Sequence, residues 1–86
     1  MNAQIEFVHH HLPAVQEACT SRYEGGAVVR IGTQPKPSAV MAYEIIFPSG
    51  ACQSFFVYEN VMEMIWKQSV PRQAAILKEY LPDAPI

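Results

Sequence analysis

Apolar residues near the N-terminus recur at the spacing of a helix. Gaps of three and four residues separate the members of one stripe, which are Ile5, Val8, Leu12, Val15 and Cys19. Pro13 interrupts this stripe, because a proline inside a helix lacks an N–H donor and its ring crowds a carbonyl. Two interpretations therefore stay open. Either a kinked helix covers about 2–23, or a short strand around 5–8 precedes a helix from Pro13 to Tyr23.

The middle of the chain alternates with the period of two that is typical of strands. The glycines of Gly25-Gly26 are expected to end the first helix, and the prolines within 33–38 indicate a loop. The motif Pro48-Ser49-Gly50 predicts a three-residue hairpin loop, in which Gly50 takes a positive φ. The predicted strands are Ala27–Ile31, Val40–Phe47 and Ala51–Tyr58.

The last third of the chain returns to helical spacing. Asn60 followed by Glu63 predicts a capping-box variant, which would start a helix that ends near Ser69 because Pro71 follows. A final helix is expected from Pro71 to Leu81.

These elements predict one compact α+β domain that spans 1–86, with 82–86 as a tail. Its order is a helix, a three-stranded antiparallel β-meander and two C-terminal helices packed mainly on one sheet face. The 86 residues and the hydrophobic share of 50% are enough for a single core and argue against disorder.

The hairpin loop fixes the strand register and therefore the two faces of the sheet. One face is predicted to form the core, with Gln53 and Ala51 near the turn. Its large residues are Met41, Tyr43, Ile45, Phe47, Phe55 and Val57. The opposite face is more apolar than a solvated sheet face should be. It carries Val40, Ala42, Glu44, Ile46, Cys52, Ser54, Phe56 and Tyr58, extended by Val28 and by Arg30 close to Glu44.

Two explanations of this second apolar face stay open. The last helix or the N-terminal stretch could fold over it and make a second core. Alternatively, the face is open in the monomer and is buried by another protein or by a second copy of the chain. In that case Arg30 and Glu44 would set the orientation of the partner.

Charge and cysteine content narrow the class of protein. Six basic against eight acidic residues give a net charge of -2, which argues against a protein built to bind phosphate backbones. No apolar run approaches the roughly 20 residues of a membrane span. The N-terminus has no basic region typical of a secretory signal. Cys19 and Cys52 are expected to be buried, reduced thiols, so we expect a cytoplasmic protein without membrane association.

The sequence indicates neither an active site nor a bound cofactor or metal. His9, His10 and His11 could hold a metal on a strand, but on a helix residues two apart diverge, and solvated or capping histidines are the simpler interpretation. No pair of carboxylates, phosphate-binding loop or cysteine–histidine arrangement is placed for catalysis. We therefore expect a protein that is not an enzyme.

The predicted order of a helix, three strands and a helix is similar to that of the double-stranded RNA-binding domain. That family carries a basic cluster at the start of the helix after the third strand. The matching stretch here, Asn60-Val61-Met62-Glu63-Met64, is acidic and apolar, so the resemblance covers the order of elements alone.

The function predicted from these observations is a small non-enzymatic protein-binding module that acts as an adaptor or inhibitor through an apolar sheet face. Short acidic domains of this kind are frequent among phage and mobile-element inhibitors of host machinery. The predicted contact residues are Phe56, Tyr58, Ile46, Val40, Arg30 and Glu44, with Trp66 and Met62 on the following helix. The alternatives are nucleic-acid binding through Arg22, Arg30 and Lys36, and a metal-dependent activity at the histidines.

Overall fold

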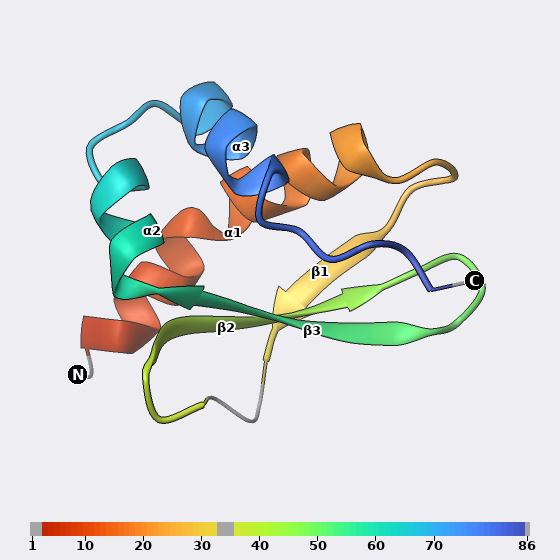
Figure 1. The fold of residues 1–86 in the computed structure, drawn as a ribbon, viewed down its shortest axis with the longest axis horizontal. Coiled ribbons are helices and arrows are strands. Elements are labelled where there is room, and N and C mark those ends of the chain that lie inside the picture. The colour runs from red at the N-terminus through yellow and green to blue at the C-terminus, as the bar shows by residue number, and fades with distance from the viewer. Residues whose placement is uncertain (1–2, 33–35, 86) are drawn as a thin grey trace.

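The protein is a three-stranded antiparallel sheet covered on one face by helices (Figure 1). The computed structural model describes the backbone of residues 3–32 and 36–85, with side chains from residue 10 onward in those ranges. The elements are α1 (Ala3–Arg22), β1 (Val28–Ile31), β2 (Ala39–Ile46), β3 (Cys52–Tyr58), α2 (Glu59–Ile65) and α3 (Val70–Lys78). The predicted α+β class and element order are confirmed. In the described part of the chain, no helix is both long and apolar enough to cross a membrane.

The sheet has the order β1-β2-β3 and the register that the hairpin loop predicts. The amide of Phe47 donates to the carbonyl of Ala51 at 2.9 Å, and the amide of Gly50 donates back to the carbonyl of Phe47 at 2.9 Å. Gly50 has a φ of 92°, a conformation that glycine adopts without the steric cost that a Cβ imposes. The turn therefore places alternate residues of β2 and β3 on fixed faces.

The predicted core face is buried. Its large residues on β2 and β3, with Phe47 beyond the end of β2, are at most 6% exposed and pack against α1, α2 and α3 residues in one core cluster. Gln53, predicted near the edge of this face, is exposed. The core lies between the sheet and the helices, and α3 packs on α1 and α2.

The first helix runs through Pro13, so the alternative of a strand around residues 5–8 is wrong. His11, on the N-terminal side of Pro13, joins Ala14, Val15 and Ala18 in one stripe that is at most 1% exposed. An interior proline costs a helix roughly 3 kcal/mol. Burial of a continuous stripe on both sides of Pro13 offsets that cost, because apolar surface removed from water stabilises by about 25 cal/mol per Å².

The two C-terminal helices begin earlier and end earlier than the sequence predicts. The capping box is wrong: the N-cap of α2 is Tyr58 with no side-chain cap bond, because the helix continues directly from β3. Asn60 therefore lies inside the first turn and Glu63 has no capping role. The helix α3 ends at Lys78, but Ala74, Leu77 and Leu81 are buried together as expected.

A buried polar contact joins α1 to α3. The Nδ1 of His11 lies 2.7 Å from Oε1 of Gln73, and Nε2 of Gln73 donates to the carbonyl of Gln68 at 2.7 Å. Because the Gln73 amide nitrogen is the donor to Gln68, its oxygen must accept from His11, which places a proton on Nδ1 of the imidazole.

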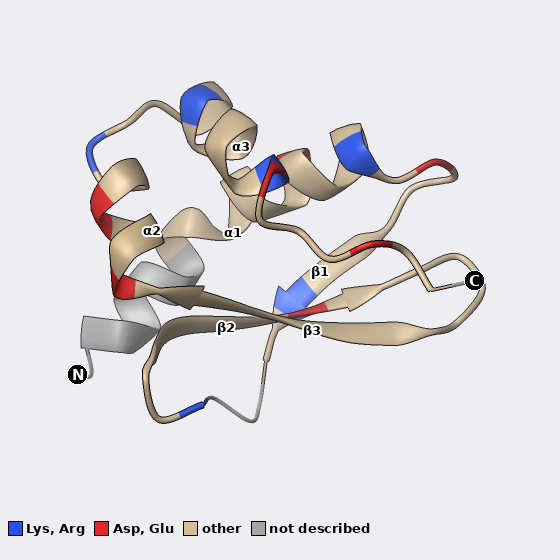
Figure 2. Ribbon diagram, viewed as in Figure 1, with Lys and Arg blue, Asp and Glu red and all other residues tan. Residues whose placement is uncertain are grey.

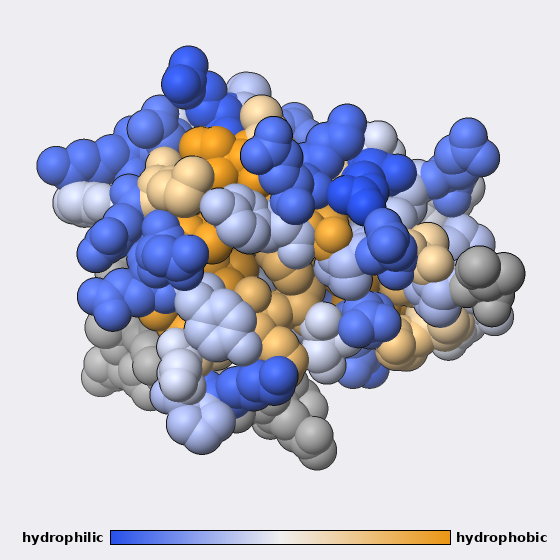
Figure 3. All heavy atoms as spheres, viewed as in Figure 1, coloured by the Kyte–Doolittle hydropathy of each residue, from blue (hydrophilic) through white to orange (hydrophobic). Residues whose placement is uncertain are grey.

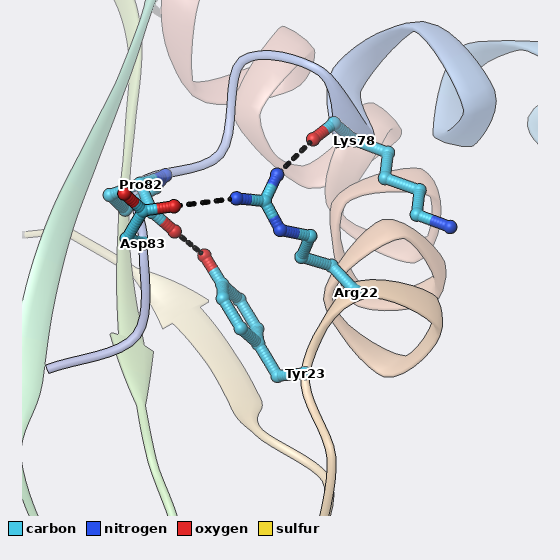
Figure 4. Close-up of polar contacts among 5 residues, drawn as sticks. All are labelled: Arg22, Tyr23, Lys78, Pro82 and Asp83. Atoms are coloured by element: carbon cyan, nitrogen blue, oxygen red, sulfur yellow. Dashed lines mark hydrogen bonds and ion pairs between the residues drawn. The ribbon is translucent and has the colours of Figure 1, made fainter. Parts of the chain in front are cut away.

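The chain after α3 is held against the end of α1 (Figure 4). Arg22 donates to the carbonyl of Lys78 at 3.1 Å and to Asp83 at 2.9 Å, while the hydroxyl of Tyr23 donates to the carbonyl of Pro82. The segment predicted as a tail therefore has defined contacts over residues 82–83.

Candidate protein-binding surface

The sheet face opposite the helices has no helix over it in the described part of the chain. We call it the outer face and define it by Val28, Arg30, Ala42, Glu44, Ile46, Cys52, Ser54, Phe56 and Tyr58. Figure 1 shows all the helices on the other side of the sheet. The alternative in which the last helix covers this face is wrong, because α3 packs on α1, on the core side of the sheet.

Apolar side chains of the outer face are accessible to different degrees. Val28 is 62% exposed and Tyr58 is 37% exposed, whereas Ile46 and Phe56 are half-buried. These four side chains come from all three strands and form two groups in the register, Val28 with Ile46 and Phe56 with Tyr58. Polar or small residues separate them along each strand.

An ion pair lies near the middle of the outer face. Arg30 and Glu44 are direct partners in the register of β1 and β2, and their side chains form the salt bridge that the sequence predicts. Figure 2 shows the two charged segments side by side on these strands. The Arg30 side chain is 63% exposed and the Glu44 side chain is 28% exposed, so the positive end is the more accessible of the two.

Lys36, from the loop between β1 and β2, lies across the outer face. Its Nζ is 5.0 Å from the centroid of the Phe56 ring, within the range of a cation–π contact. A partner that binds Phe56 would have to displace or include Lys36.

A hollow of about 340 Å³ lies beside the outer face at the start of α2. We call it the α2 hollow and define it by its lining residues Val40, Glu59, Met62, Glu63 and Trp66. Val40 sits at an irregularity in the pairing of β2 with β3, between Ala39 and Met41. Such a bulge re-aims a side chain, and here Val40 lines the hollow together with residues of α2.

The α2 hollow thus unites three of the predicted contact residues, Val40, Met62 and Trp66. The prediction that Met62 and Trp66 are both left outside the core is half wrong. Trp66 is 52% exposed, but Met62 is 8% exposed and belongs to the core cluster, so Met62 lies at the bottom of the α2 hollow.

Met64 is the exposed methionine of α2 and contacts a different element. The hydroxyl of Tyr80 lies 3.6 Å from its sulfur, and both side chains are more than 40% exposed. Figure 3 shows an apolar strip between α2 and α3, bordered by hydrophilic residues. Met64 and Tyr80 do not belong to the outer face as defined above.

Two carboxylates and a cation–π contact shape the charge of the α2 hollow. Glu59 and Glu63 are four residues apart on α2, so they lie on the same side of the helix. Within the described part of the chain neither has an ion-pair or hydrogen-bond partner. Trp66 already contacts a cation, because Nζ of Lys67 is 4.5 Å from its ring centroid.

Glu59 and Glu63 were not among the predicted contact residues. The predicted capping box gave Glu63 a structural role and left Glu59 before the helix. The signal that could have found them is their spacing of four, which matches the spacing of Met62 and Trp66 on the same helix.

Of the three histidines, His11 differs from the solvated or capping role expected of them. His10 is exposed and His11 is buried against Gln73, while the side chain of His9 lies outside the described residues. Burial lowers the pKa of His11, the hydrogen bond to Gln73 raises it, and the charge of His10 lowers it. Among the described residues, no group of three or more metal-ligating side chains comes together.

The cysteines have opposite environments. Both are free, but only Cys19 is buried, so the expectation that Cys52 is buried is wrong. Cys52 is on the outer face at the edge strand β3, where its side chain meets solvent. Burial raises the pKa of the Cys19 thiol to about 11, a shift opposite to the one that activates a cysteine nucleophile.

The basic residues considered for nucleic-acid binding do not form one patch of free cations. Arg22 is tied to Lys78 and Asp83, and Arg30 is paired with Glu44. Figure 2 shows acidic segments on α2, where a double-stranded RNA-binding domain would be basic.

No family model matches the sequence, and comparisons with the curated proteins and with the solved structures gave no match.

Proposed function

We propose that this protein is a small protein-binding module that acts as an adaptor or inhibitor, with the outer face as its main contact surface. The observation that supports this proposal most is the apolar area of Val28, Tyr58, Ile46 and Phe56 on a sheet face that no described helix covers. Clusters of accessible apolar side chains on a folded domain are typical of interaction sites.

The composition of the face favours another protein over a second copy. Interfaces of obligate homodimers are more apolar than those of partners that also exist alone. Here the ion pair of Arg30 and Glu44, together with Ser54, interrupts the apolar residues, and Lys36 already contacts the Phe56 ring. A mixed polar and apolar surface of this kind is typical of a transient complex with another protein.

Paired variants on different surfaces test the proposal. Val28→Glu and Tyr58→Ser change the outer face, whereas Val70→Glu and Tyr80→Ser make the same changes on or just after α3. The members of each pair have comparable exposure, at 62% and 42% for the valines and 37% and 45% for the tyrosines. All four variants should fold, because the positions are exposed, and serine at Tyr58, the N-cap of α2, is a residue that N-cap positions favour.

The assay is co-purification from extracts of the source cells, followed by reconstitution with the purified partner. We expect a partner to bind the wild type and both α3 variants equally, and each outer-face variant about tenfold less tightly, the effect of about 1.4 kcal/mol at an interface. Equal binding by all four variants would contradict the proposal, as would a wild-type protein that is a stable dimer through this face.

A further inference from the structure

The α2 hollow has the apolar floor and the acidic border that a basic side chain requires. Its volume of about 340 Å³ is at the lower end of the ~300–1,000 Å³ of ligand pockets, so it fits one side chain and its neighbours better than a cofactor. Met62 and Val40 supply apolar contacts, and Glu59 and Glu63 supply negative charge at its edge.

The two carboxylates are arranged unfavourably in the free protein. Like charges four residues apart on a helix destabilise it, and Lys67, which follows α2 four residues after Glu63, forms no ion pair with either carboxylate among the described residues. A cation bound between Glu59 and Glu63 would remove this repulsion. The free protein therefore has an electrostatic reason to favour a positively charged occupant.

The tryptophan adds a second contact for a cation. An ammonium over an indole face is attracted by the ring quadrupole, and tryptophan is the best of the aromatic residues for this contact. The chain's own Lys67 makes this interaction with Trp66, so the ring is accessible to a lysine. Trp66 is 52% exposed and has room for a further contact.

We propose that the α2 hollow binds a lysine or arginine side chain of the partner protein, and this inference rests on the proposed function. The hydrocarbon stem of such a side chain would lie on Met62 and Val40, while its charged end would reach Glu59 and Glu63. Val40 belongs to β2, as do Ala42 and Ile46 of the outer face, so a partner segment crossing that face can place its basic residue in the hollow.

A blocked peptide with lysine between two leucines is the probe for this site. Matched peptides carry norleucine or glutamate in place of the lysine. Binding is followed by the amide resonances of the protein and by the indole N–H of Trp66, which is the single tryptophan of the chain. We expect the lysine peptide to shift Trp66 and the residues around the hollow saturably, with the norleucine peptide weaker and the glutamate peptide weakest.

The double variant Glu59→Gln with Glu63→Gln tests the role of the carboxylates. Its control, Glu24→Gln with Glu79→Gln, changes the net charge equally at exposed positions outside the hollow. We expect the hollow variant to bind the lysine peptide roughly three- to tenfold more weakly and the control to bind like the wild type, since exposed ion pairs are individually weak. Glutamine at both positions keeps the helix, which the unchanged amide spectrum would verify.

The outcomes separate this inference from the proposed function. Equal binding of the lysine and norleucine peptides, equal binding by both double variants, or no shift at Trp66 would overturn the basic-side-chain site. If that happens while Val28→Glu still reduces partner binding, the outer face remains the binding surface. If the peptide binds as expected but partner binding ignores every outer-face variant, the proposed function fails and the hollow remains a cation site.

Discussion

The contact between His11 and Gln73 should contribute measurably to the stability of the fold. We consider Gln73→Met, which keeps the length of the side chain and removes both its hydrogen bonds. The first is the bond accepted from Nδ1 of His11, and the second is the bond donated to the carbonyl of Gln68, each 2.7 Å long. His11 is 1% exposed and Gln73 is 4% exposed, so water cannot easily replace the lost partner.

The expected loss follows from this burial. Leaving a buried polar group without its partner costs about 1–3 kcal/mol, so we expect the free energy of unfolding to fall by about 2 kcal/mol. For a domain of this size, the midpoint of thermal unfolding should drop by about 10 °C. The control is Gln68→Met, because that side chain is exposed and only its backbone carbonyl takes part. Urea unfolding of Gln73→Met within about 0.5 kcal/mol of the wild type would refute the reasoning.

The same contact predicts a pH dependence. Burial holds the pKa of His11 below its usual 6.5, so the unfolded chain binds the proton more tightly than the folded one. Above about pH 6.5, His11 is neutral in both states and does not change the free energy of unfolding. As the pH falls below 6.5 toward the folded pKa, the free energy of unfolding decreases by at most about 1.4 kcal/mol per pH unit. His11→Gln, which keeps an amide donor for Gln73, should lose less stability than the wild type between about pH 7.5 and 5.5. An equal or larger loss in the variant would show that His11 does not titrate in this way.

Three further predictions concern single residues. In the native protein a thiol reagent should modify Cys52, which is exposed, and should reach Cys19 only after unfolding; two equivalents of native reactivity would contradict the buried position of Cys19. Gly50→Ala should lower the free energy of unfolding by about 1–2 kcal/mol. The added Cβ would meet no neighbour, so the loss comes from the φ of 92°, which strains a residue that carries a Cβ. No change in urea unfolding would mean that the turn adopts another conformation. Tyr23→Phe should lose about 1 kcal/mol by removing the bond to the carbonyl of Pro82, whereas Tyr80→Phe should lose less, and the reverse order would argue against the contacts of the C-terminal segment.

The strands and their faces were predictable from the sequence because short-range rules determine them. Pro48-Ser49-Gly50 sets the register, and the alternation of β2 and β3 then assigns Tyr43 and Ile45 to the core and Glu44 to the outer face. The salt bridge of Arg30 with Glu44 depends on the separate pairing of β1 with β2, which this turn does not set.

The errors arise where contacts distant in sequence decide the structure. Pro13 disfavours a helix locally, but the stripe that includes His11 and Ala18 is buried against elements far along the chain. Asn60 is a good local cap, yet the direct passage from β3 into α2 leaves it inside the helix. The partner of His11 is 62 residues away, so no local pattern could indicate it.

The candidate surface was predictable only where alternation along a strand determines it. Phe56, Tyr58 and Ile46 were assigned to the outer face by alternation, and whether a helix covered them depended on where α3 packs. The α2 hollow depends on the irregularity at Val40 and on the start of α2 at Glu59, and neither has a clear sequence signal.

The measurement that tests the central claim most directly is the solution mass and melting temperature of the wild type and of Phe56→Glu. If the outer face is open and serves another protein, both should be folded monomers near 9.6 kDa with similar melting temperatures, because Phe56 is half-buried on a sheet face that no described helix covers. A wild-type dimer that becomes monomeric in the variant would show that the face joins two copies. An unfolded variant would show that Phe56 belongs to a core, and either result would contradict the account.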